Sequence, residues 1–204
     1  MNQDKEYIKF RYEWDNQGFF FPEKSFEKIN YWRNKLYEKN LIGAIDKFIG
    51  FGNISLRIDK TNQFIISGSA TGLYENLNKL SYAKVTDFNI DNNFIRCVGG
   101  TKASSESLTH AAIYQNNQSI NGIVHTHHKG LWKALLHKKP TTSKKASFGT
   151  TELAREIENL VRKPETLKEK IIILDGHEEG ILTIGETLEE AVNTLLNEFY
   201  QLEN

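Results

Sequence analysis

Residues 123–130 read IVHTHHKG, a stretch in which two β-branched aliphatic residues are followed at once by three histidines. The aliphatic pair predicts a buried strand. Side chains alternate between the two faces of a strand, so His125 and His127 share one face while Thr126 and His128 share the other. Neutral imidazole is a good ligand for zinc and related ions, and the pair therefore indicates a metal site. The alternative is two polar positions on a solvated strand face.

A metal site requires at least one further ligand, and four more histidines are present in the chain. His177 lies in the turn LDGHEEGIL between two predicted strands, where a rigid scaffold commonly presents functional side chains. His110 is interpreted as a partly buried helical residue and His137 as a surface residue, while His128 is interpreted as structural. An ion held by three histidines keeps an open position, which is the catalytic pattern.

Chemistry at such an ion also needs a group that moves protons. Glu106 lies in KASSESLTH, residues 102–110, at the predicted start of a helix. The alternative role for Glu106 is electrostatic, because acidic side chains stabilise a first helical turn. Ser104 or Ser105 is predicted to be the N-cap residue of this helix.

The surrounding periodicity predicts an α/β layered fold with a mixed or mainly antiparallel sheet flanked by helices. Helices are expected over 22–40, 104–116, 129–138, 150–163 and 186–201. Strands are expected over 53–58, 63–68, 85–90, 93–98, 121–127, 170–174 and 180–185. With no linker or repeat visible, residues 1–204 are expected to form a single domain.

Composition narrows the class of protein. The 204 residues include 26 basic and 26 acidic residues, and a net charge of zero gives no attraction to nucleic acid or an anionic membrane. No apolar run approaches the roughly 18 residues that span a bilayer. The N-terminus is polar and unlike a secretory signal. The single cysteine, Cys97, fits a reducing compartment and is interpreted as a small core residue, so a cytoplasmic protein is expected.

Small-residue loops suggest a place for a phosphate group. GFGNIS (50–55) and SGSATG (67–72) flank strands, and the serine pair at 104–105 lies at the start of a predicted helix. Such loops expose backbone N–H groups, which bind anions without a lysine or arginine clamp. Neither the P-loop pattern nor the dinucleotide fingerprint is present, which argues against nucleotide binding.

Five landmarks together resemble the class II aldolase/adducin family, and they occur in the family's order. They are GNIS (52–55), SATG (69–72), KASSE (102–106), VHTH (124–127) and GHEEGIL (176–182). The family includes fuculose-phosphate aldolase, ribulose-phosphate 4-epimerase, methylthioribulose-phosphate dehydratase and the noncatalytic domain of adducin. Residues 1–45 match the family least well.

The resemblance implies a set of site residues and an architecture. His125, His127 and His177 look like the metal ligands, usually of zinc, and Glu106 falls where the aldolases hold their acid/base carboxylate. The positions that match the family's substrate phosphate site are Gly52, Asn53, Thr71, Gly72, Ser104 and Ser105. The implied fold is a three-layer α/β/α domain around a mainly antiparallel sheet, assembled as a homotetramer.

The implied function is that of a metal-dependent lyase acting on a phosphorylated ketose, by aldol cleavage through a metal-stabilised ene-diolate. The alternatives are a sugar-phosphate dehydratase or epimerase using the same site, or a noncatalytic adducin-like module. Glutamate at position 106 favours an aldolase or dehydratase, because the epimerases are expected to carry aspartate there. Beside the third ligand the sequence departs from the family pattern, because Glu178 and Glu179 follow His177 directly. Tyr114 and Tyr200 are the candidates for a catalytic tyrosine.

Overall fold

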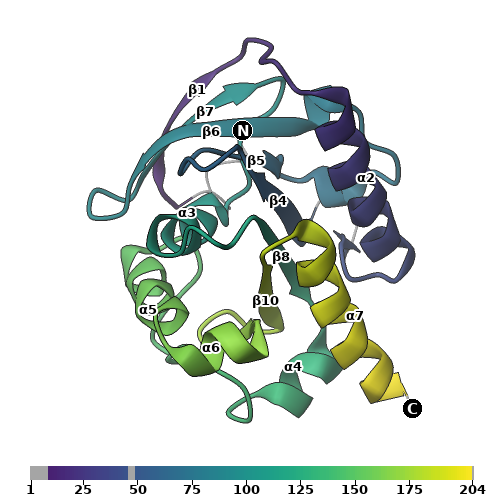
Figure 1. Ribbon diagram of the computed structural model, residues 1–204, viewed down its shortest axis with the longest axis vertical. Coiled ribbons are helices and arrows are strands. Elements are labelled where there is room, and N and C mark those ends of the chain that lie inside the picture. The colour runs from purple at the N-terminus through teal and green to yellow at the C-terminus, as the bar shows by residue number, and fades with distance from the viewer. Residues whose placement is uncertain (1–8, 46–48, 204) are drawn as a thin grey trace.

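The computed structural model describes residues 9–45 and 49–203 and has a large central sheet between two layers of helices (Figure 1). The strand order is β1-β7-β6-β5-β4-β8-β10-β9. Within the described residues, β1 and β7 pair in parallel and every other neighbouring pair in this sheet is antiparallel. The strands are β1 Arg11–Asp15, β4 Asn53–Arg57, β5 Phe64–Ser67, β6 Tyr82–Asn89, β7 Phe94–Gly99, β8 Gly122–His127, β9 Ile171–Ile173 and β10 Gly180–Gly185.

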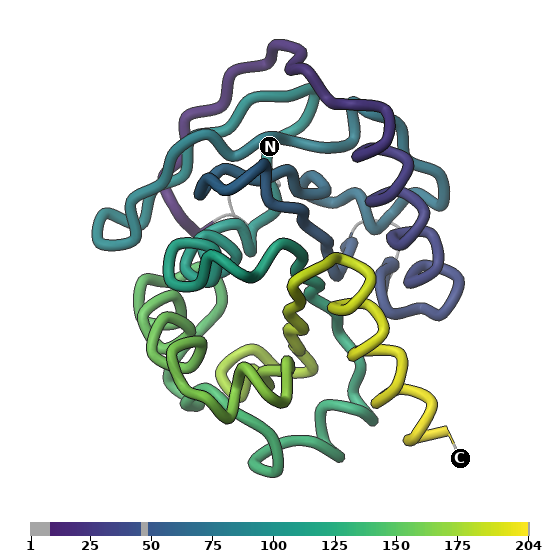
Figure 2. The backbone as a smooth tube through the Cα atoms, viewed as in Figure 1, coloured from purple at the N-terminus to yellow at the C-terminus, as the bar shows by residue number. Residues whose placement is uncertain are grey.

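Helices cover both faces of the sheet (Figure 1). They are α2 Glu23–Glu38, α3 Ser107–Asn116, α4 Lys129–Leu135, α5 Thr151–Val161, α6 Pro164–Glu169 and α7 Leu188–Glu203. Helices α3 and α5 pack on one face, whereas α2, α4 and α7 pack on the other. Figure 2 shows α2 running beside the C-terminal helix α7, and the two helices are in contact. A separate ribbon pairs β2 Gly43–Ala44 with β3 Gly50–Phe51.

A hydrophobic core lies on each face of the sheet, because side chains alternate between the two faces along every strand. Ile123 packs in the core under α3 and α5, and Val124 packs in the core under α2 and α7. His125 and His127 therefore project on the α3 side, while the Thr126 hydroxyl on the other side donates to the carbonyl of Leu41. Both faces of β8 are buried, which is why its sequence carries a continuous aliphatic start.

The expected α/β/α fold and mainly antiparallel sheet are confirmed, with differences at individual elements. The predicted N-cap at Ser104 or Ser105 is wrong: Glu106 occupies that position, and the Ser104 hydroxyl instead accepts a hydrogen bond from the Glu106 N–H. The helix expected over 129–138 ends at Leu135. Just beyond it, His137 has a φ of 60°, which a right-handed helix does not accommodate.

Strand β1, helix α6 and the ribbon of β2 and β3 were not expected. Strand β1 is almost entirely exposed at the sheet edge. Tyr12 and Trp14 alternate with charged residues along it, a pattern too short to predict a strand by itself. Helix α6 has six residues and begins at Pro164, so its apolar stripe is too short to detect. Residues 1–8, the polar start of the chain, lie outside the described residues. Over the described ranges, no helix combines the length and apolar character needed to cross a membrane.

Candidate functional site

The antiparallel ladder between β8 and β10 brings the third histidine to the first two. Within this ladder His127 is opposite Gly180, which lies three residues after His177. The backbone N–H of His128 donates to the Glu179 carbonyl at 3.0 Å, and this bond extends the pairing into the turn. The turn that carries His177 is therefore held at the end of β8 where the H-x-H pair lies.

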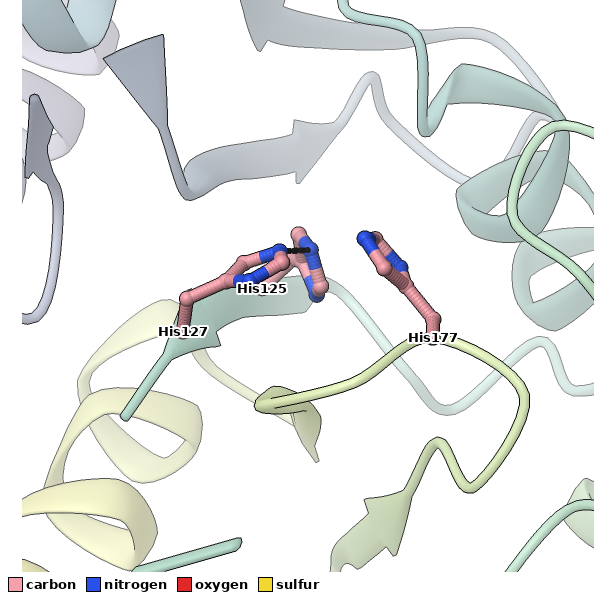
Figure 3. Close-up of side chains that lie close together, drawn as sticks. All are labelled: His125, His127 and His177. Atoms are coloured by element: carbon pink, nitrogen blue, oxygen red, sulfur yellow. Dashed lines mark hydrogen bonds between the residues drawn. The ribbon is translucent and has the colours of Figure 1, made fainter. Parts of the chain in front are cut away.

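His125, His127 and His177 form one cluster (Figure 3), with one ring nitrogen of each lying within 4.8 Å of the others. The Nε2 atoms of His125 and His127 are 3.1 Å apart. His125 Nδ1 lies 3.2 Å from the Ile181 carbonyl, which can only accept a hydrogen bond. In the neutral ring Nδ1 therefore carries the proton, and the lone pair of Nε2 points into the cluster, as in a metal ligand oriented by a backbone carbonyl.

Burial keeps all three rings neutral at pH 7. It lowers the pKa of His125 well below the usual value, that of His127 to about 3 and that of His177 to about 4. Desolvation is the largest cause in each case, since a charged imidazolium loses hydration inside the protein. Because neutral imidazole is the metal-binding form, the cluster is ready to bind a cation. His125 is 1% exposed, which excludes the alternative of a solvated strand face.

Glu106 adjoins this cluster from the start of α3. Its Oε1 atom lies 3.4 Å from His177 Nδ1, and its Oε2 atom accepts a hydrogen bond from the Thr109 hydroxyl at 3.1 Å. Its side chain makes no capping hydrogen bond to the helix, so capping does not account for its burial. Desolvation raises the pKa of Glu106 to about 7, partly opposed by the Thr109 hydroxyl and the positive charge of Lys9.

A cavity of about 460 Å³ opens over the histidines and the small-residue loops. All the positions expected to hold a phosphate line it: Gly52, Asn53, Thr71, Gly72, Ser104 and Ser105. Glu106, the three clustered histidines, Ile45, Ile49, Phe51 and Phe148 complete much of the wall. Among the described residues that line the cavity, none is lysine or arginine, so any anion there is bound through N–H and hydroxyl groups.

Several buried polar atoms of this wall lack hydrogen-bond partners among the described residues. They are Asn53 Oδ1, Glu106 Oε1 and His177 Nδ1. The 3.4 Å approach between Glu106 and His177 is an ion pair only if the ring is protonated, which burial opposes. Unpaired buried polar groups cost about 1–3 kcal/mol each, so their gathering in one cavity indicates a polar ligand or cation.

Phe148 and Lys9 belong to this site but were not predicted. The Phe148 ring stacks on His177, with ring centroids 4.9 Å apart, and the Lys9 ammonium lies 3.7 Å from the centroid of the Phe148 ring. The side chain of Asn93 donates to the carbonyls of both Lys9 and Gly149, which ties the N-terminal segment to the loop of Phe148. No local motif marks either residue, because their proximity depends on contacts between distant segments.

The other histidines lie outside the cluster. His110 is fully buried, more than the partial burial expected, and its Nδ1 atom lies 2.7 Å from the Ser55 hydroxyl. His128 Nδ1 accepts a hydrogen bond from the Leu131 N–H and caps α4, which confirms a structural role. The His137 side chain is exposed, as expected.

Four other residues singled out from the sequence do not line the cavity: Tyr114, Tyr200, Glu178 and Glu179. Tyr114 is buried in the core, where its hydroxyl pairs with Ser55, and Tyr200 lies on the exposed side of α7. Glu178 is exposed, and Glu179 Oε1 lies 4.0 Å from Lys129 Nζ, outside the cavity. Their carboxylates therefore leave the lining of the cavity unchanged.

Gly176 supports the third histidine through close packing, which generates a first prediction. A Cβ atom at Gly176 would lie 2.3 Å from the carbonyl oxygen of Ala146, a rigid backbone atom. We expect Gly176→Ala to displace His177 and to weaken zinc binding at least about tenfold, the scale of disturbed ligand support. Gly18→Ala is the matched control, because nothing lies within 4 Å of its added Cβ. An unchanged zinc dissociation constant in a chelator competition would contradict this role.

Glu106 predicts a pH dependence of stability in the metal-free protein. Its folded pKa of about 7 exceeds the usual 4.5, so between these values the unfolded state releases this proton and the folded state keeps it. Wild-type stability should therefore fall relative to Glu106→Gln as pH rises from 4.5 to 7, by at most about 3 kcal/mol, and then level off. Urea unfolding of both proteins across this range measures the difference. A difference that does not change with pH would refute the shifted pKa.

Comparison with known proteins agrees with this geometry. Residues 47–198 match the family described as the class II aldolase and adducin N-terminal domain. The chain is 32% identical over 168 residues to the L-fuculose phosphate aldolase of Methanococcus maripaludis, covering 74% of this chain and 82% of the relative. It is also 32% identical over 79 residues to the 3-oxo-tetronate 4-phosphate decarboxylase of Haemophilus influenzae, covering 38% of this chain and 33% of that protein.

Solved structures show the same fold. An L-fuculose 1-phosphate aldolase structure superposes with a TM-score of 0.66 at 20% identity, covering 90% of this chain and 85% of that one. The region matched by the family excludes the N-terminal segment that was expected to be least similar. The family match, the curated aldolase relative and the fold agree, and the chain belongs to the class II aldolase/adducin family.

Proposed function

We propose that this chain is a zinc-dependent lyase that cleaves a phosphorylated ketose by an aldol mechanism. The observation that carries the proposal is the buried cluster of His125, His127 and His177 with the Glu106 carboxyl against it. A noncatalytic module has no need for three inward-facing neutral imidazoles and a buried acid, since each burial costs stability. This favours the enzymatic members of the family over the adducin-like module.

The three imidazoles fit a divalent ion. Their ring nitrogens converge, they are neutral, and the Nδ1–H of His125 is already bonded to a carbonyl. A three-histidine set leaves room for substrate oxygens, and zinc is the ion whose ligand preferences it suits best. When bound, such an ion supplies Lewis-acid polarisation of a carbonyl group and stabilises the negative charge that develops on its oxygen.

The proposed phosphate site consists of backbone N–H groups and polar side chains, without a cationic side chain among the described lining residues. We assign the phosphate to the N–H and hydroxyl groups of Gly52, Thr71, Gly72, Ser104 and Ser105 together with the Asn53 amide, all of which line the cavity. The histidine cluster lines the same cavity, which supports this assignment. Phe148 forms an apolar part of the wall beside His177 and excludes water from that side.

Glu106 is assigned the proton transfer. A carboxyl group with a pKa of about 7 exists in both protonation states near neutrality, which suits a group that takes up and returns a proton during cleavage. The hydrogen bond from Thr109 to Oε2 fixes the carboxyl and leaves Oε1, which lacks a hydrogen-bond partner among the described residues. We assign the proton transfer to Oε1.

Decarboxylation of a 3-oxo acid phosphate is the second candidate function. It is supported by the similarity to the 3-oxo-tetronate 4-phosphate decarboxylase, which covers 38% of this chain. Both reactions break a carbon–carbon bond next to a carbonyl group and leave negative charge on its oxygen, so the same residues serve either one. Dehydration and epimerisation would use the same site, but we consider them less favoured candidates than carbon–carbon bond cleavage.

Product analysis tests the proposed reaction. Zinc-loaded protein is incubated with a panel of phosphorylated ketoses and 3-oxo acid phosphates, and the products are identified by mass spectrometry. Two fragments, one of them a phosphorylated three-carbon ketone, would establish aldol cleavage. Loss of carbon dioxide would establish the decarboxylase, and loss of water a dehydratase. No turnover of any compound by fully zinc-loaded protein would contradict the lyase.

Variants test the assigned roles. His177→Ala should lower zinc content well below one ion per chain, because two imidazoles hold zinc much less tightly than three. Glu106→Gln should keep its zinc and lose at least about a hundredfold in turnover, the scale of general acid–base catalysis. His137→Ala is the control, since its side chain is exposed and outside the cluster. Full zinc in His177→Ala, or full activity in Glu106→Gln, would refute the respective role.

We also propose that the enzyme assembles as a homotetramer in the cytoplasm. Ile45, which lines the cavity, is 70% exposed. Tyr74 follows the Thr71–Leu73 turn, which contacts the Gly43–Ala44 strand before Ile45, and is 61% exposed. A neighbouring subunit that covered this surface would remove it from water and narrow the cavity mouth. Light scattering of the purified protein should give four times the chain mass, and a monomer would contradict the assembly.

A further inference from the structure

Arg33 is a buried cation directly behind the small-residue loop of the cavity. It comes from the middle of α2 and is 1% exposed. Its Nη2 atom donates to the Thr71 carbonyl at 3.0 Å and also to the Tyr74 carbonyl, while Nη1 donates to the Glu75 carbonyl. One guanidinium group thus binds three backbone carbonyls of one short loop.

This charge has no close counter-ion. Among residues 9–45 and 49–203, no carboxylate lies within ion-pair distance of Arg33, and its remaining polar contact is with the Asn34 side chain at 3.4 Å. The Glu75 carboxylate and the hydroxyls of Tyr37 and Tyr82 act on it from farther away. The guanidinium also lies over the Tyr37 ring, 4.5 Å from its centroid. A buried charge that is solvated mainly by carbonyl dipoles projects a positive potential through those peptide groups.

The geometry of the peptide bond directs that potential into the cavity. In a planar trans peptide the C=O and N–H groups point in opposite directions. The Thr71 carbonyl points at Arg33, so the N–H of Gly72 in the same peptide group points away from it. Gly72 lines the cavity, and among the described residues its N–H makes no hydrogen bond. The loop packs closely on the Gly43–Ala44 strand, since a Cβ at Gly72 would lie 2.2 Å from the Gly43 carbonyl oxygen.

We propose that Arg33 is a positioning residue for phosphate recognition, which acts through the Thr71–Gly72 peptide without touching the substrate. It holds the Thr71–Leu73 turn (η1) in the one orientation that presents the Gly72 N–H to the cavity. Its charge also polarises that N–H toward an anion, which makes the loop selective for a phosphate monoester over a neutral group. This inference rests on the proposed phosphate site and names the residue that organises it.

Arg57 provides a matched control within the same chain. Its guanidinium is also buried, at 5% exposed, and it likewise donates to backbone carbonyls, among them those of Ile120 and Tyr114. It lies outside the cavity lining. Loss of either arginine removes a buried charge and several hydrogen bonds, but only Arg33 contacts the loop that carries Gly72.

The test is binding of glycerol 3-phosphate to zinc-loaded protein by calorimetry, in wild type, Arg33→Met, Arg33→Lys and Arg57→Met. Arg33→Met should bind the ester about tenfold more weakly, which corresponds to about 1.4 kcal/mol. Arg33→Lys, which keeps the charge but reaches fewer carbonyls, should recover part of the loss. Zinc content should stay at one ion per chain in all variants, and Arg57→Met should bind the ester like wild type.

The outcomes separate this inference from the proposed site. If wild type fails to bind glycerol 3-phosphate, the proposed phosphate site is refuted, and the role of Arg33 is refuted with it. If wild type binds and Arg33→Met binds equally well, the phosphate site stands and the role of Arg33 is refuted. An equal loss in Arg57→Met would mean general destabilisation and would also refute it. Should Arg33→Met not fold, Arg33→Lys decides, because wild-type affinity in that variant overturns the proposal.

Discussion

The antiparallel pairing of β8 with β10 is the constraint on which the site depends. It sets His127 opposite Gly180 and holds the turn containing His177 at the end of β8. A shift of one residue in this register would turn the H-x-H pair to the opposite face of the sheet. The aliphatic residues of both strands, which are buried on both faces, therefore fix the pairing that brings the imidazoles together.

The site is a set of buried polar groups that are not satisfied by one another. The histidine cluster is neutral, and within the described part of the chain Glu106 and Asn53 each have one side-chain oxygen without a hydrogen-bond partner. Such an arrangement costs folding free energy, and it is maintained because the surrounding sheet and helices are tightly packed. A cation and an anionic substrate would offset that cost, which links the energetic cost of this arrangement to the function proposed for it.

Local sequence patterns predicted the elements better than the contacts between them. Strand β10 was predicted with its observed bounds, because alternation, length and flanking turns are local properties. The roles of Phe148 beside His177 and of Arg33 behind Thr71 were not predicted, since they depend on how distant segments pack. The N-cap of α3 was wrongly predicted for a similar reason. Two adjacent serines satisfy the same local rule, whereas in the packed structure Glu106 occupies the N-cap position.

The central claim is that three imidazoles from two separate segments bind one ion. Anomalous diffraction at the zinc edge, on crystals of zinc-loaded protein, tests it most directly. We expect one strong anomalous peak per chain, which marks the zinc ion, about 2.0–2.1 Å from a ring nitrogen of each of His125, His127 and His177. A peak elsewhere, or none at saturating zinc, would contradict the site and the chemistry built on it.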